Sequence, residues 1–183
     1  MTLSQILVLS AHMLDDGDLA TACGGVVDAS QQDKVNLLIS CANQVNSIIA
    51  TDYVHIFKTK TISSTNGKIS MSSIDSNGIV GICYVKQGGV DVDWEIVDGA
   101  LSTVSGSVKI KYMSQPTTLS NLTDLVNDFP QLSARVLAYG VTAEYLFIKG
   151  NIEDAESWNI RFKSAINGIQ RSKNLVMHTR RWY

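Results

Sequence analysis

Three carboxylates that alternate with apolar side chains are the residues whose spacing could most readily create a binding or catalytic site. Asp91, Asp93 and Glu95 are each separated by one apolar residue. Because side chains at alternate positions of a strand point to the same side, we expect the three acids to share one strand face. Such a face could bind a divalent cation, or it could simply be solvated. A solvated face is the simpler interpretation, and a cation-dependent hydrolase that uses these three residues stays open as an alternative.

The other residue types that carry out catalysis or bind metals are scattered along the chain. They are Cys23, Cys41, Cys83, His12, His55 and His178. The cysteine spacings match neither a disulfide framework nor a CxxC metal clip, and no His lies three or four residues from another His or Cys. GxSxG, GxxxxGK[ST] and HExxH are absent, as is GxGxxG after a strand. We expect small buried thiols, no metal site, no cofactor and no enzymatic activity.

The C-terminal end of the chain combines positive charge with aromatic side chains. From Ser157 to Tyr183 there are six basic residues and no acidic ones, so this stretch carries +6 against −8 for the preceding 156 residues. Charge asymmetry of this kind is typical of an interaction arm. The last four residues, Arg180 to Tyr183, are of the types that most often anchor protein interfaces. They suit a pocket in another protein better than nucleic acid, and a frayed tail is the alternative.

The pattern along the chain indicates helices, then strands, then helices, with changes near Thr51 and Pro116. Ser4 is expected to cap a short helix through Leu14, and a turn-rich stretch follows. From Asp33, apolar residues at alternating steps of three and four predict an amphipathic helix that ends near residue 50. Its apolar positions are Val35, Leu38, Ala42, Val45 and Ile49, widened by Cys41 and Ile48, while Asn43, Gln44, Asn46 and Ser47 fall on other faces.

The last third of the chain predicts a helical hairpin. Thr118 or Ser120 can start a short helical turn, and Pro130 is expected at the first position of the strongest helix. Gly150 then ends this helix, and Asn151 caps a second one. The two apolar faces consist of Leu132, Val136, Tyr139, Ala143 and Leu146, and of Ile152, Ala155, Trp158, Phe162, Ile166 and Ile169. Glu153, Asp154 and Glu156 lie in the first turn of the second helix, where they complement the helix dipole.

Between these helical parts the hydrophobic period changes to two. Turn dipeptides recur at Asn66-Gly67, Asn77-Gly78, Gly88-Gly89, Asp98-Gly99 and Ser105-Gly106. This spacing predicts short antiparallel strands, among them 54–57, 79–83, 90–96 and 108–112. We therefore expect an α+β fold. In it, an α-helical bundle formed by residues 1–51 and 113–172 carries an inserted antiparallel β-sheet or small β-sandwich domain at 52–112. A basic and aromatic C-terminal arm follows at 173–183.

The composition fits one globular domain or two small ones. The chain has 183 residues, of which 45% are hydrophobic and 17% charged. Its longest apolar stretches are far shorter than the roughly 18 residues that a bilayer crossing needs. The first residues lack the basic start of a signal peptide. We expect a protein that is made in the cytoplasm and does not associate with a membrane.

The order of parts resembles that of a known family. The chain begins with a helix, which is followed by a β-insertion and a helical hairpin. The hairpin contains Ala138-Tyr139-Gly140, Ala143-Glu144-Tyr145 and the stretch Trp158 to Phe162, and the chain ends with a terminal Arg-Arg-Trp before its last residue. From about Asp33 onward this resembles the head-to-tail connector (adaptor) proteins of tailed bacteriophages and prophages. The resemblance implies a structural protein of the virion neck with no catalytic role. No part of the resemblance covers residues 15–30.

The resemblance also implies partners. Members of this family assemble as a ring, here expected to hold about twelve copies. The ring docks on the portal protein and offers a platform to the tail or to a second neck protein. DNA is expected to pass through the central channel without specific binding, which the net negative charge outside the tail favours. By this resemblance the portal-binding positions are Arg171, Lys173, Arg180, Arg181, Trp182 and Tyr183.

Two other functions stay open beside this one and the hydrolase. A baseplate or tail-completion protein of the same virion could be built on the same fold. A nucleic-acid-binding protein would use the basic tail on phosphates, with an affinity that falls steeply as the salt concentration rises.

Overall fold

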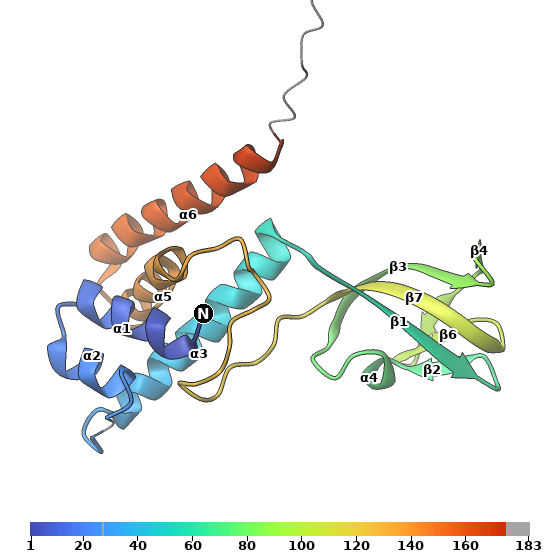
Figure 1. Cartoon of the computed structure of the whole chain (residues 1–183), viewed down its shortest axis with the longest axis horizontal. Coiled ribbons are helices and arrows are strands. Elements are labelled where there is room, and N and C mark those ends of the chain that lie inside the picture. The colour runs from blue at the N-terminus through green and yellow to red at the C-terminus, as the bar shows by residue number, and fades with distance from the viewer. Residues whose placement is uncertain (27, 175–183) are drawn as a thin grey trace, which may run out of the picture. The chain divides into compact units, whose positions relative to one another are not determined.

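The chain folds into two compact units of an α+β structure. The computed structural model describes residues 1–26 and 28–174, and side chains as far as residue 169. A helical unit consists of Met1–Ile48 together with the chain from Leu119 onward, and a β unit consists of Ile49–Thr118 (Figure 1). The sequence pattern placed the two boundaries at 51/52 and 112/113. The predicted α+β class is confirmed.

The N-terminal part of the helical unit differs from the prediction in its caps. In α1 (Leu3–Met13) the cap is Thr2, whose hydroxyl accepts the N–H of Gln5 while the Gln5 side chain accepts the N–H of Thr2. Ser4 instead donates to the carbonyl of Cys23 at 2.7 Å. Cys23 ends α2 (Gly17–Cys23), a short helix in the stretch that was expected to be rich in turns. Asp16 makes this helix possible because its carboxylate accepts the N–H of Leu19.

The long helix α3 (Gln32–Ile48) follows the predicted stripe closely. The five predicted stripe positions are all buried, four of them on α3 and the fifth, Ile49, just after its end, and Cys41 is buried with them. Asn46, which the pattern placed on another face, is buried too. The helix continues into one turn of π-helix, η1 (Ile49–Tyr53), with which the β unit begins.

One side chain of α3, that of Asn43, anchors the backbone where the chain returns from the β unit. The amide of Asn43 donates to the carbonyl of Leu119 and accepts its N–H, each at 2.8 Å. A side-chain amide that bonds both backbone groups of one residue fixes that residue as a short strand would. Leu119 itself is buried.

The segment between Leu119 and Ser133 is irregular, so the helical turn expected at Thr118 or Ser120 is wrong. The carboxylate of Asp124 accepts the N–H groups of Ser120 and Asn121 and holds a local turn in place of a helix. Beyond it, the backbone of residues 122–126 bonds to that of residues 1–4. The irregular segment therefore packs against the N-terminus of the helical unit.

Helices α5 (Ala134–Ile148) and α6 (Ile152–Asn174) form the predicted hairpin. Pro130 does not start α5, because Ser133 provides the cap by accepting the N–H of Val136. The turn between the helices contains Gly150 at a φ of +80°, as expected. Helices α1, α3 and α6 all pack on α5. Most residues of α5 between Val136 and Tyr145 are buried as a result, well beyond the single face that was predicted.

The β unit contains two antiparallel sheets. Its elements are β1 (Ile56–Ser64), β2 (Lys68–Ser70), the short helix α4 (Met71–Ile74), β3 (Ile79–Gln87), β4 (Val90–Asp91), β5 (Glu95–Val97), β6 (Ala100–Ser102) and β7 (Gly106–Ser114). One sheet has the order β1-β7-β3-β4 and the other β2-β6-β5. Residues of both sheets share one core, to which Ile69 and Leu101 contribute from the small sheet and Val108 and Ile110 from the large one.

The predicted strand 90–96 is divided between the two sheets. Val90 and Asp91 pair with β3, whereas Glu95 to Val97 pair with β6. The chain changes sheets at residues 92–94, which is how a sandwich turns a corner. The turn dipeptides, by contrast, lie between strands as predicted, except that Gly106 is already the first residue of β7. Every glycine among them has a positive φ.

Close packing at Gly140 yields a prediction about the helical unit. A Cβ at this position would lie 2.9 Å from side-chain atoms of both Val45 and Phe162. We predict that Gly140→Val lowers the free energy of unfolding by about 2 kcal/mol, because two helices would have to move apart. Denaturant titration measures this change.

Gly168 provides the matched control. An added Cβ there meets no atom within 4 Å, and Gly168 also lies in a helix. Gly168→Val should leave the free energy of unfolding within about 0.5 kcal/mol of the parent. Equal effects of the two substitutions would show that α5 does not pack as described.

Candidate interaction surfaces

Helix α6 leads to the residues that were predicted to bind a partner. Arg171 and Lys173 belong to α6, close to its end. The structure describes their backbone but not their side chains. Arg180, Arg181, Trp182 and Tyr183 lie outside the described residues altogether. The structure therefore describes the helix that carries the predicted arm and leaves the arm's contacts as a prediction.

In the part of α6 whose side chains the structure describes, Ile152 to residue 169, only one side is buried. Ala155, Phe162 and Ile166 are buried, and α5 is the main neighbour of this helix. Ile160 points elsewhere and is 68% exposed. Ile152 was expected on the buried face but is half-exposed, because it lies at the start of the helix beside the turn.

Aromatic and basic side chains lie together along the first half of α6. The ring of Trp158 packs against that of Tyr139 at an interplanar angle of 33°, with 5.6 Å between centroids. The guanidinium of Arg161 lies 4.6 Å from the centroid of the Trp158 ring. Both aromatic residues are partly exposed, so this group of three is available to a partner. The combination of Trp, Tyr and Arg is the one that most often anchors protein interfaces.

The charge along α6 changes sign from its start to its end. Glu153 and Asp154 are exposed in its first turn, and Asn151 donates to the carboxylate of Asp154 at 2.6 Å. From Ser157 onward the sequence is basic. Negative charge at the N-terminus of a helix and positive charge toward its C-terminus both complement the helix dipole. Glu153 and Asp154 therefore lie in the first turn as predicted, whereas Glu156 lies beyond it.

The three carboxylates considered for cation binding do not share one strand face. Asp91 lies on β4, Asp93 in the connection between the sheets and Glu95 on β5. Asp91 is also 3.5 Å from the ammonium of Lys86. Within residues 1–26 and 28–174, no group of three or more His, Cys, Asp or Glu side chains is placed to hold a metal ion. The expectation of one shared face is wrong because the strand is divided between two sheets.

The cysteines differ from one another in exposure. Burial raises the pKa of both Cys23 and Cys41 to about 11, so these thiols are protonated at neutral pH. Cys83 is exposed, contrary to the expectation that all three are buried. Among the histidines, the Nδ1 atom of His55 lies 2.9 Å from the carbonyl of Ala50.

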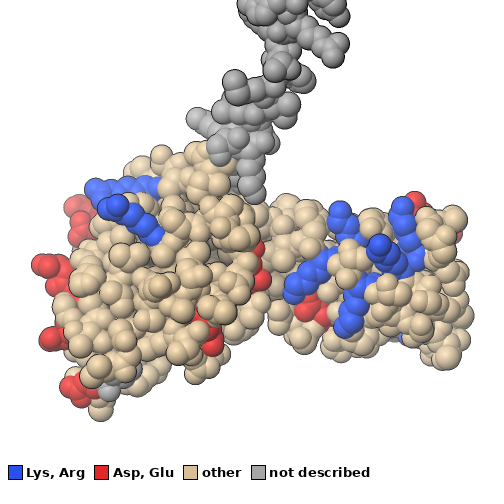
Figure 2. Space-filling model, viewed as in Figure 1, with Lys and Arg blue, Asp and Glu red and all other residues tan. Residues whose placement is uncertain are grey.

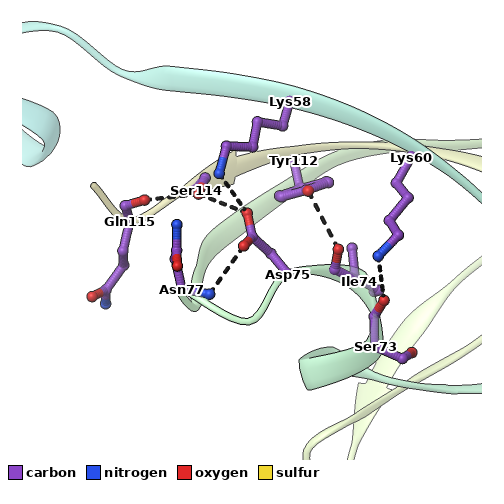
Figure 3. A network of polar contacts seen from close by, with 9 residues as sticks. All are labelled: Lys58, Lys60, Ser73, Ile74, Asp75, Asn77, Tyr112, Ser114 and Gln115. Atoms are coloured by element: carbon purple, nitrogen blue, oxygen red, sulfur yellow. Dashed lines mark hydrogen bonds and ion pairs between the residues drawn. The ribbon is translucent and has the colours of Figure 1, made fainter. Parts of the chain in front are cut away.

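A network of polar contacts around Asp75 connects several segments of the β unit (Figure 3). The carboxylate of Asp75 accepts hydrogen bonds from Ser114 at 2.7 Å, from Lys58 at 3.0 Å and from the N–H of Asn77 at 3.0 Å. Close by, the hydroxyl of Tyr112 donates to the carbonyl of Ile74. Strands β1 and β7 are thus joined to the segment that precedes β3.

The pKa of Asp75 reflects these contacts. Burial alone would raise the pKa, since the side chain is only 7% exposed. The hydrogen bonds from Asn77, Ser114 and Lys58 outweigh burial and lower the pKa to about 2. All the groups around this carboxylate are occupied by the fold itself, so the network stabilises the β unit.

The lowered pKa yields a prediction about acid stability. A depressed pKa stabilises the fold above the unfolded value of 3.8, and that stabilisation is lost as the pH falls toward about 2. We predict that Asp75→Asn lowers the free energy of unfolding by about 2 kcal/mol at pH 7 and much less at pH 2. Urea titrations at pH 7, 4 and 2 measure the difference.

The control for this experiment is Asp98→Asn, which changes an exposed acid in a turn of the same unit. This substitution should leave stability unchanged at all three pH values. If Asp75→Asn lost as much stability at pH 2 as at pH 7, Asp75 would not be the group whose protonation destabilises the unit.

Comparison with known proteins adds no family: no protein-family model matches the chain, and no curated protein matches it either. In the described part of the chain, no helix has the length and apolar character needed to cross a membrane.

Proposed function

We propose that this chain is a structural protein of a tailed-bacteriophage virion, a head-to-tail connector (adaptor) of the neck. Copies of the chain form a ring that docks on the portal protein. The ring offers a platform to the tail or to a second neck protein, and DNA passes through its central channel. The chain assembles in the host cytoplasm and acts by binding other proteins, without a cofactor.

The observation that carries this proposal is the one-sided packing of α6. This helix has 23 residues, and its side chains that the structure describes, as far as residue 169, are buried on one side only. The other sides of this described part carry Ile160 and the Trp158–Arg161 pair, and the sequence from Ser157 onward is basic. A long helix that stabilises its own unit with one side only is suited to present its end to another protein.

The insertion of the β unit also supports an assembling protein. Helices of one bundle come from both ends of the chain, so the β unit is an insertion in the middle of the sequence, and the chain at both its ends continues into the bundle. Each copy then offers two separate surfaces, one on each unit. Repetition around a ring multiplies weak contacts on such surfaces into a stable assembly.

The experiment is sedimentation of the purified chain with the portal ring encoded by the same genome. We predict that the full chain co-sediments in many copies and that a chain ending before Arg171 does not. The variant Arg180→Glu with Arg181→Glu should weaken the binding at least about tenfold, because two favourable charges become unfavourable ones.

The matched control reverses two basic residues elsewhere on the helical unit. Arg135 and Lys149 are both exposed and lie at the two ends of α5. Arg135→Glu with Lys149→Glu should bind the portal as the parent does. Equal binding by the parent and the truncated chain would contradict the role of the arm. Binding to DNA that the truncation abolishes would favour the nucleic-acid function instead.

A further inference from the structure

One side of the large sheet in the β unit carries lysines and aromatic rings. Along β7, Val108, Ile110 and Tyr112 point into the core, so Lys109 and Lys111 point to the opposite side. Their partners on β3 are Lys86 and Tyr84, and Phe57 of β1 also faces outward. We call this surface the lysine face: it consists of Phe57, Tyr84, Lys86, Lys109 and Lys111. Figure 2 shows lysine side chains gathered on the visible side of this unit.

The lysine face is held in place and left uncovered. The ammonium of Lys111 lies 4.9 Å from the ring centroid of Phe57 and 5.9 Å from that of Tyr84. Phe57 is nevertheless 53% exposed. Lys86 reaches the exposed carboxylate of Asp91, whereas Lys109 and Lys111 make no ion pair with any described residue. Two positive charges and two rings are therefore open to a partner of negative charge.

A second surface of the same unit has the opposite charge. Residues 93–98 are all exposed and include Asp93, Glu95 and Asp98; we call them the acidic segment. The chain has no basic residue between Lys86 and Lys109. The segment also exposes Trp94, which is 37% exposed, and Ile96, which is 52% exposed. It contains β5, an edge strand of the small sheet.

A pocket in the acidic segment has the chemistry of an ammonium-binding site. Its volume is about 250 Å3, and its walls are formed by Asp93, Trp94, Glu95, Ser102 and Thr103. Two carboxylates and an indole together attract an ammonium group through charge and through the face of the ring. The Thr103 hydroxyl already donates to the Asp93 carbonyl, which shapes one wall.

We propose that the lysine face of one copy packs on the acidic segment of a second copy, with a lysine side chain entering the pocket. This inference rests on the proposed ring and names the contact between its subunits. The two surfaces match in charge, and each adds exposed apolar side chains. Like surfaces repel each other, so the contact is head-to-tail, the arrangement that closes into rings.

Charge favours a second copy over nucleic acid as the occupant. The β unit has six lysines and six acidic residues, so it carries no net positive charge to attract phosphates. The acidic segment of a second copy supplies three carboxylates together with the exposed side chains of Trp94 and Ile96, so it matches both the lysines and the rings of the lysine face.

Charge exchange tests the proposal. A face variant carries Lys109→Glu and Lys111→Glu, and a segment variant carries Asp93→Lys and Glu95→Lys. We predict that each variant alone needs at least about ten times the parent concentration to associate in sedimentation. An equimolar mixture of the two should associate as the parent does, because each altered surface then meets a complementary one.

The matched control is Lys68→Glu, an exposed lysine of β2 outside the lysine face, which should associate as the parent does. Circular dichroism confirms that each variant is folded. The proposal is overturned if the parent does not associate, if the variants associate as the parent does, or if their mixture stays dissociated. It is also overturned if the parent binds DNA and the face variant alone loses that binding.

The same variants separate this inference from the proposed function. A parent that associates by charge exchange but ignores the portal would contradict the connector function and leave the subunit contact standing. If the chain bound the portal but its self-association did not respond to the charge exchange, the connector function would stand and the proposed subunit contact would be contradicted.

Discussion

The insertion of a β unit into a helical bundle depends on the pairing of β1 with β7. Nine residue pairs join these strands, from Ile56 opposite Ser114 to Ser64 opposite Gly106. The first and last strands of the unit are therefore neighbours, and the chain enters and leaves the β unit at the same end. The amide of Asn43 then bonds both backbone groups of Leu119 where the chain returns to the bundle. Closing a long loop between two helices is entropically unfavourable, and the antiparallel ladder and the amide bonds offset that cost.

Elements with a strong local signal could be predicted from the sequence. The apolar stripe of α3 and the glycines of the β turns depend on short-range periodicity and on backbone conformation. The errors arose where one side chain decided between alternatives. Asp16 caps a helix in a stretch full of turn residues, and Ser133 competes with Pro130 for the start of α5. The division of segment 90–96 could not be predicted, because a change of sheet depends on a core that both sheets share.

The candidate surfaces divide in the same way. The basic and aromatic arm is contiguous in the sequence, so composition alone identified it. The lysine face is assembled from β1, β3 and β7, and only the strand register shows that Tyr84 lies opposite Lys111 and Lys86 opposite Lys109. Its one sequence signal is the alternation of Lys109 and Lys111 with core residues of a predicted strand. Two acids of the acidic segment, Asp93 and Glu95, were recognised in the sequence together with Asp91 as alternating carboxylates, but the exposure of the segment and its pocket follow from the corner between the two sheets.

We propose that many copies of this chain form one closed assembly in the virion neck. Native mass spectrometry of the purified chain over a range of concentrations tests that claim most directly. We expect one dominant assembly whose mass is a fixed multiple of the 19.9 kDa chain and does not change with concentration once it has formed. A monomer at every concentration would contradict a closed assembly, and so would assemblies whose mass keeps increasing with concentration.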